Sequence, residues 1–149
     1  MNFFFVSPIQ FVDQRQMQEG GDGAPLTGDC DAACIASFTG IPLAEIPLFY
    51  TTGEPVVVQG AKRTAWLLER GWGSLSYPLA AAHEGGYAFI GTLVHITGKS
   101  PRGNFNHGVL GEIVEGGWRL VHDPHPSRAG IVGEPVCFEY MFPLPRLAA

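Results

Sequence analysis

Cys30 is the strongest candidate for a nucleophile in this sequence, because it stands where a short helix is expected to begin. The stretch from Thr27 to Gly40 predicts that helix, with Thr27 or Asp29 as the cap and Gly40 as the stop. The free amides and the dipole of a first helical turn favour a thiolate, which is a strong nucleophile. The alternative is that Cys30 and Cys34, one turn apart, are two small buried apolar residues.

His107 and Asp123 are placed to complete a nucleophilic site. A cysteine hydrolase needs a histidine as general base and an acid that orients it. His107 opens a predicted strand after a polar loop, and Asp123 ends the partner strand of the same hairpin. Taken singly, His107 fits a solvated residue at a strand start, and the pair Asp123-Pro124 fits an ordinary turn. Alternation along the strands puts both side chains on one face only if the hairpin loop is odd in length or one bulge is present.

The motifs around these residues resemble the papain-like cysteine hydrolases, and among them the C39-like peptidase group. The resemblance rests on Gly28-Asp29-Cys30, on the segment 33–37, on His107 at a strand start and on Asp123-Pro124. Segments 12–14, 28–43, 100–103 and 121–127 also resemble small uncharacterised proteins of bacteria and their phages. The resemblance implies Cys30 as nucleophile, His107 as base, Asp123 as the orienting acid, and a papain-like fold.

The resemblance also implies a glutamine whose side-chain amide points into the oxyanion hole. The usual position close to the cysteine is not glutamine here, which leaves Gln14, Gln16 and Gln18 as candidates, with Gln14 preferred. Asp31 stands where the C39-like group usually has glycine, and an acid beside Cys30 opposes the thiolate.

Two residues near the predicted triad are candidates for substrate binding. Arg102, in the loop before His107, can hold a substrate carboxylate. The alternative for Arg102 is a solvent-exposed loop arginine. Asp29, next to Cys30, is the second candidate.

The pattern of elements predicts an α+β fold in a single domain, residues 1–149, with N-terminal helices packed on a C-terminal antiparallel sheet. Helices are expected at 27–40 and 60–70, with a short helical turn at 41–47. Strands are expected at 75–79, 87–97, 107–115, 118–123 and 132–142. The run Val56–Val58 fits a strand or an apolar linker.

Composition excludes several classes of partner and predicts the compartment. A net charge of −5 argues against binding to nucleic acid or to an anionic membrane. The apolar start, residues 3–6, is too short to span a bilayer. Three cysteines form no disulfide framework and fit a reducing, cytoplasmic location. The sequence does not indicate an oligomeric state.

The sequence therefore predicts thiol-dependent hydrolysis of an amide bond in a peptide or a peptide-like conjugate, through an acyl-enzyme and without a cofactor. The alternative function is a non-catalytic papain-like domain that binds a peptide or a partner. A metal site at His122, Asp123, His125 and Cys137 is a weaker interpretation, since the spacing contains no paired cysteines.

Overall fold

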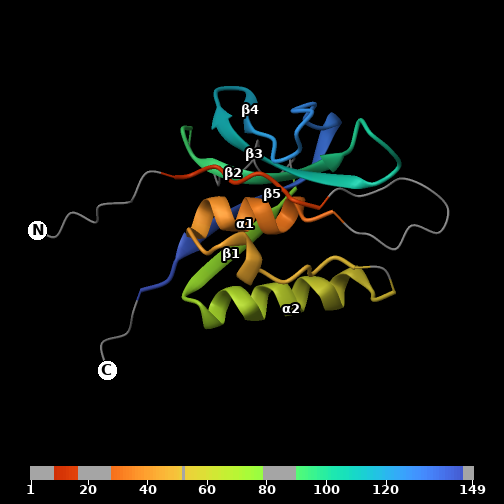
Figure 1. Cartoon of the computed structure of the whole chain (residues 1–149). Helices are drawn as coiled ribbons and strands as arrows, with labels where there is room; N and C mark the ends of the chain where they lie inside the picture. The colour runs from red at the N-terminus through yellow and green to blue at the C-terminus, as the bar shows by residue number, and fades with distance from the viewer. Residues whose placement is uncertain (1–8, 17–27, 52, 79–89, 146–149) are drawn as a thin grey trace, which may run out of the picture.

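The computed structural model describes residues 9–16, 28–51, 53–78 and 90–145. Within these residues, two α-helices and one 3-10 turn precede five strands (Figure 1). The elements are α1 (Cys30–Thr39), η1 (Leu43–Glu45), α2 (Val56–Glu69), β1 (Trp72–Tyr77), β2 (Leu93–Lys99), β3 (Asn106–Val114), β4 (Gly117–His122) and β5 (Val132–Pro143).

Helix α1 begins at Cys30, as the sequence predicts, and ends at a left-handed glycine. Gly40 has φ 72° and donates its N–H to the carbonyl of Ala36, so it closes the helix as expected. Of the two predicted capping residues, only Asp29 lies among the described residues. Asp29 occupies the N-cap position but makes no side-chain capping hydrogen bond. Thr27 lies outside the described residues.

Helix α2 begins earlier than its predicted start, and Val56–Val58 form its first turn rather than a strand or linker. The three valines are β-branched, which favours a strand locally. Pro55 precedes them at the N-cap, however, and packing along the helix overrides the local preference. Leu67 is fully buried against α1 and β5. The backbone turns at Arg70, and Gly71 follows with φ 78°.

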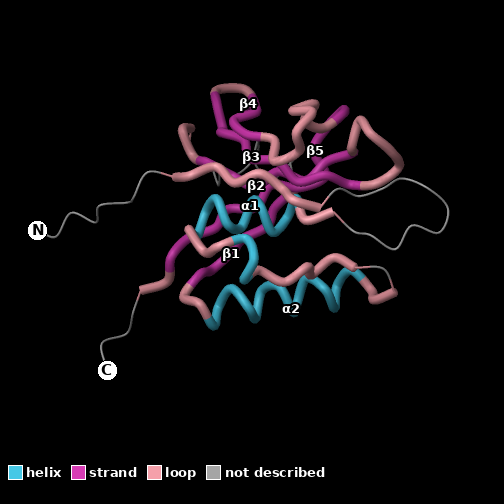
Figure 2. The backbone as a smooth tube through the Cα atoms, in the orientation of Figure 1, coloured by secondary structure: helices cyan, strands magenta, loops and turns pink. Residues whose placement is uncertain are grey.

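The five strands form one antiparallel sheet in the order β1-β5-β2-β3-β4, which confirms the α+β class (Figure 2). Strand β5 lies between β1 and β2, so the end of the chain joins the two halves of the sheet. The strand expected at 87–97 is β2, which begins at Leu93; residues 87–89 of that prediction lie outside the described residues.

Helix α1 occupies the centre of the molecule, between the sheet and α2 (Figure 1). Its apolar residues pack with η1, with Leu67 and with Met141 of β5. A second apolar cluster packs β2, β3 and β5 together. It consists of Val94, Ile96, Val109, Ile113 and Phe138. None of the helices in the described part of the chain has the length and apolar character needed to cross a bilayer.

The β3–β4 hairpin contains the bulge that the proposed geometry requires. Its turn consists of Glu115 and Gly116, and Gly117 already pairs with Val114, so the loop has an even length. The register then shifts, because Leu110 pairs with His122 while its neighbour Gly111 pairs with Leu120. Val121 is the extra residue. Because of this shift, Asp123, which directly follows His122, lies on the same face of the hairpin as His107.

Candidate active site

Cys30 lies at the start of α1 with its sulfur facing strand β3. The backbone N–H of Gly108 is 3.5 Å from Cys30 Sγ. Burial raises the pKa of the Cys30 thiol to about 11, the Gly108 amide lowers it, and the neighbouring charge of Asp31 raises it further. This burial opposes the thiolate that the helix start favours. At the helix start, desolvation outweighs the favourable amides.

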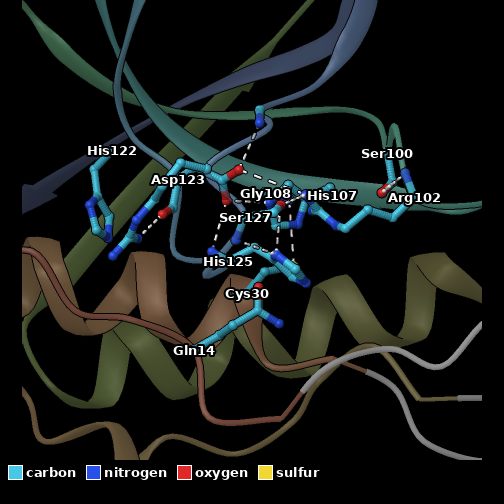
Figure 3. Close-up of polar contacts among 12 residues, drawn as sticks. Gln14, Cys30, Ser100, Arg102, His107, Gly108, His122, Asp123, His125 and Ser127 are labelled. Atoms are coloured by element: carbon cyan, nitrogen blue, oxygen red, sulfur yellow. Dashed lines mark hydrogen bonds and ion pairs between the residues drawn. The ribbon is translucent and has the colours of Figure 1, made fainter.

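His107 and Asp123 meet by their side chains, as the hairpin argument requires. His107 Nε2 is 2.7 Å from Asp123 Oδ1, and both side chains are buried. A carboxylate accepts, so Nε2 carries the proton and Nδ1 is the unprotonated nitrogen of the neutral ring. Cys30 and His107 line the same two cavities, which brings them to one site (Figure 3).

Asp123 is held as a carboxylate by three donors. Besides His107, the backbone N–H of His125 donates to Oδ1 at 2.8 Å and that of Gly130 donates to Oδ2 at 2.7 Å. Burial alone raises the pKa of Asp123, but these hydrogen bonds outweigh it and lower the pKa to about 2. The carboxylate is thus ionised and fixed in orientation at neutral pH.

Gln14 comes to the site from the N-terminal segment, which runs beside α1. Its backbone N–H donates to Pro124 O at 3.0 Å, directly after Asp123. Gln14 lines a small cavity together with Cys30 and His107 (Figure 3). Its Nε2 donates to Gln16 O at 2.8 Å, and its buried Oε1 has no hydrogen-bond partner among the described residues. The structure therefore brings the preferred glutamine to Cys30 across the intervening loop.

Asp29 makes contacts within the chain that the sequence did not indicate. Its buried carboxylate accepts the backbone N–H groups of Arg15 and Gln16, at distances from 2.9 to 3.2 Å. Both carboxylate oxygens accept hydrogen bonds within the chain, and substrate binding by Asp29 stays a prediction. It fixes the segment that carries Gln14 against the start of α1.

Arg102 lies against the triad rather than in open solvent. Its Nη1 donates to Ser127 Oγ at 3.0 Å and is 3.8 Å from Asp123 Oδ2. Its Nη2 is buried and has no hydrogen-bond partner among the residues described, and the side chain lines the small cavity with Gln14. Arg102 thus has a free donor beside the site, and substrate binding by Arg102 stays a prediction.

A buried charged cluster beside Cys30 is absent from the sequence-based site. We call Asp31, Arg63, His95 and Glu139 the charged cluster. Arg63 forms two hydrogen bonds to Glu139, at 2.5 and 2.8 Å, and its Nε contacts both carboxylate oxygens of Asp31 at 3.0 and 3.1 Å. His95 Nδ1 is 3.2 Å from Glu139 Oε2. All four line a cavity of about 780 Å³ that also contains Cys30 and His107.

The charged cluster has four members from four elements, which is why spacing in the sequence does not reveal it. The available signal was the occurrence of His95 and Glu139 inside strongly apolar strands, where a charged residue needs a buried partner. The contacts within the cluster favour the ionised form of Glu139. Burial alone would raise the pKa of Glu139, but His95 and Arg63 lower it to about 2.

The residues of the weaker metal interpretation have other contacts. His122 stacks on Phe11 and its Nε2 is 3.2 Å from Val12 O, while His125 Nδ1 contacts Ser127 Oγ at 2.9 Å. Within residues 9–16, 28–51, 53–78 and 90–145, no group of three or more His, Cys, Asp or Glu side chains is arranged to hold a metal ion.

Comparison with protein-family models, with curated proteins and with solved structures gave no match for this chain.

Proposed function

We propose that this protein is a thiol-dependent hydrolase that cleaves an amide-type bond, with a papain-like arrangement of Cys30, His107 and Asp123. The observation that carries the proposal is the buried contact of 2.7 Å between His107 Nε2 and Asp123 Oδ1 beside Cys30. A general base needs one nitrogen fixed by an acceptor so that the other is free to take a proton, and this contact supplies that condition.

The reaction proceeds by two acyl transfers. His107 Nδ1 takes the Cys30 proton as the sulfur attacks the substrate carbonyl, and His107 then gives this proton to the leaving amine as the C–N bond breaks. Water attacks the thioester, again with His107 as base, and the protonated His107 returns the proton to Cys30 sulfur as the carboxylic acid leaves. Burial raises the pKa of the Cys30 thiol, which favours a proton transfer to His107 that accompanies the attack.

The oxyanion formed during each attack needs two donors. Backbone amides in the first turn of a helix have no intrahelical partner, so the amide of Cys30 can supply one of them. The second is Gln14, whose Nε2 has one N–H on Gln16 O and one N–H left. Asp29 contributes by holding the backbone of this segment.

A non-catalytic domain that binds a peptide or a partner is the second candidate function. Two features favour it: the burial that raises the pKa of the Cys30 thiol, and the existing contact between the Gln14 amide and Gln16 O. In that case the cavity of about 780 Å³ would bind a ligand without breaking a bond.

Acyl transfer from p-nitrophenyl acetate tests the proposal without knowledge of the natural substrate. We expect acetylation of Cys30, seen by mass spectrometry after rapid quenching, followed by release of acetate. His107→Ala should slow the acetylation by about 100-fold or more, the usual contribution of a general base.

Cys137 provides an internal control, because it lines the same cavity and has no place in the triad. Acetylation of Cys30 no faster than that of Cys137, or an unchanged rate in His107→Ala, would contradict the hydrolase and favour the binding domain. A stable acetyl group on Cys30 would show that the thiol attacks the ester but that water does not hydrolyse the resulting thioester.

A further inference from the structure

We propose that the charged cluster forms a subsite for a positively charged group, an ammonium or guanidinium, on the substrate of Cys30. This inference rests on the proposed function and specifies its substrate class, namely amides with a basic side chain near the cleaved bond. It stands on the charge balance of the cluster, an unused buried acceptor, and the position of both beside the sulfur.

Apart from His95, the side chains of the cluster carry a net negative charge. Asp31 and Glu139 are two carboxylates that face one guanidinium, so one negative charge is left when His95 is neutral. Each of the three nitrogens of Arg63 already contacts a carboxylate oxygen. An anionic ligand would have to displace one of these carboxylates, whereas a cation would neutralise the excess negative charge. The cluster therefore selects for positive charge.

His95 supplies an acceptor that nothing in the described chain uses. Its side chain is about 5% exposed and lines the cavity, and its Nε2 has no hydrogen-bond partner among the described residues. Because Nδ1 contacts the Glu139 carboxylate, the proton of the neutral ring lies on Nδ1 and Nε2 is left to accept. A buried acceptor without a partner is costly, and an N–H of a cationic ligand removes that cost.

The subsite is adjacent to the reacting sulfur. Asp31 directly follows Cys30, and with a side chain 17% exposed it is the most accessible member of the cluster. His95 Nε2 packs against Gly108, whose amide contacts Cys30 Sγ. The hydroxyl-bearing residues Ser74 and Thr97 line the same cavity and offer further acceptors. A cation bound to Asp31 would thus place the neighbouring carbonyl near Cys30.

Binding to the Cys30→Ala variant tests the subsite separately from catalysis. We would titrate this variant with N-acetyl-lysine amide, N-acetyl-norleucine amide and N-acetyl-glutamate amide and follow protein amide shifts by NMR. The lysine and norleucine probes have nearly the same shape and differ in charge. We expect lysine amide to bind about tenfold more tightly than norleucine amide, the effect of one charge-assisted hydrogen bond, with glutamate amide weakest.

Asp31→Asn in the same background should remove the preference for lysine amide, while Glu134→Gln, an exposed acid of β5 outside the cavity, should leave it unchanged. Equal binding of lysine and norleucine amides to the Cys30→Ala protein would overturn the proposal, and this comparison does not depend on the folding of the Asp31 variant. A lysine preference that survives Asp31→Asn would also overturn it. A lysine preference in a protein whose Cys30 is never acylated would retain the subsite and reject the hydrolase.

Discussion

At the scale of single residues, the state of the Cys30 proton decides how the site works. A helix start usually favours the thiolate, but here burial dominates and raises the pKa of the thiol to about 11. In the proposed mechanism, His107 takes the proton during attack and Asp123 holds His107 in the right tautomer.

Alkylation of Cys30 should follow this high pKa. With iodoacetamide we expect slow labelling at pH 7 and a rate that rises about tenfold per pH unit up to pH 10, because only the thiolate reacts. Labelled peptides identified by mass spectrometry give the rate for each cysteine. A rate for Cys30 that is already high and constant between pH 6 and 8 would indicate a thiolate paired with an imidazolium, contrary to this description.

The three residues of the proposed triad, which line or contact one site, could be picked out from the sequence because each has a local signal. Cys30 precedes an apolar helical stretch, His107 opens a strand and Asp123 precedes a proline. The charged cluster could not be predicted, since its members meet only when α1, α2, β2 and β5 pack together. The role of Asp29 was missed for a related reason: its partners, the amides of Arg15 and Gln16, belong to a separate segment.

At the scale of elements, the approach of β3 to β2 and α1 depends on a residue without a side chain. A Cβ built on Gly108 would lie 2.5 Å from His95 Nε2, and the His95 ring is fixed by Glu139. The fold thus needs glycine here for close approach of two strands, at the position that also donates to Cys30 Sγ.

Gly108→Ala should lower the free energy of unfolding by about 1–3 kcal/mol, the usual cost of overpacking a core position. Gly117→Ala is the matched control, because a Cβ at that strand position meets nothing within 4 Å. Urea unfolding of both variants measures the difference. Equal free energies of unfolding for the two variants would mean that the His95 ring moves away from the added methyl group at little cost.

Helix α2 is joined to the rest of the molecule by the charged cluster. Arg63→Met should lower the free energy of unfolding by about 3–5 kcal/mol, since it leaves Glu139 buried and partly unpaired. Lys62→Met is the neighbouring control: its ion pair with Glu54 is exposed and should contribute less than about 1 kcal/mol. Thermal or urea unfolding measures both variants. An equal loss of the free energy of unfolding in the two would contradict this role for Arg63.

At the scale of the whole molecule, helices before an antiparallel sheet were predictable because apolar runs and glycine boundaries are strong local signals. The strand order was not, since β5 inserts between β1 and β2 through contacts distant in sequence. Val56–Val58 were assigned wrongly because a short β-branched run favours a strand locally, whereas here it forms an exposed first turn of α2.

The stability of the whole chain should fall in acid. The pKa values of Asp123 and Glu139 are both about 2 in the folded protein, below the ordinary values of 3.8 and 4.5. A lowered pKa means stability that is complete above the unfolded pKa and lost as pH falls through the folded one. We expect a loss of about 2 kcal/mol per group between pH 4.5 and pH 2, measured by urea unfolding. Asp123→Asn should reduce this pH dependence, and an unchanged slope would mean that other carboxyl groups cause it.

The bulge at Val121 also determines how the hairpin tolerates changes in chain length. Deleting one residue of β4 near the bulge turns it into a regular ladder, with Leu110 still opposite His122 and Asp123 in its former place. Strand β3 contains no spare residue between His107 and Leu110, so a deletion there would rotate His107 to the other face. Length variation that preserves the site should therefore accumulate in β4 and not in β3, and a scan of single deletions with acetylation of Cys30 as the readout would show this asymmetry.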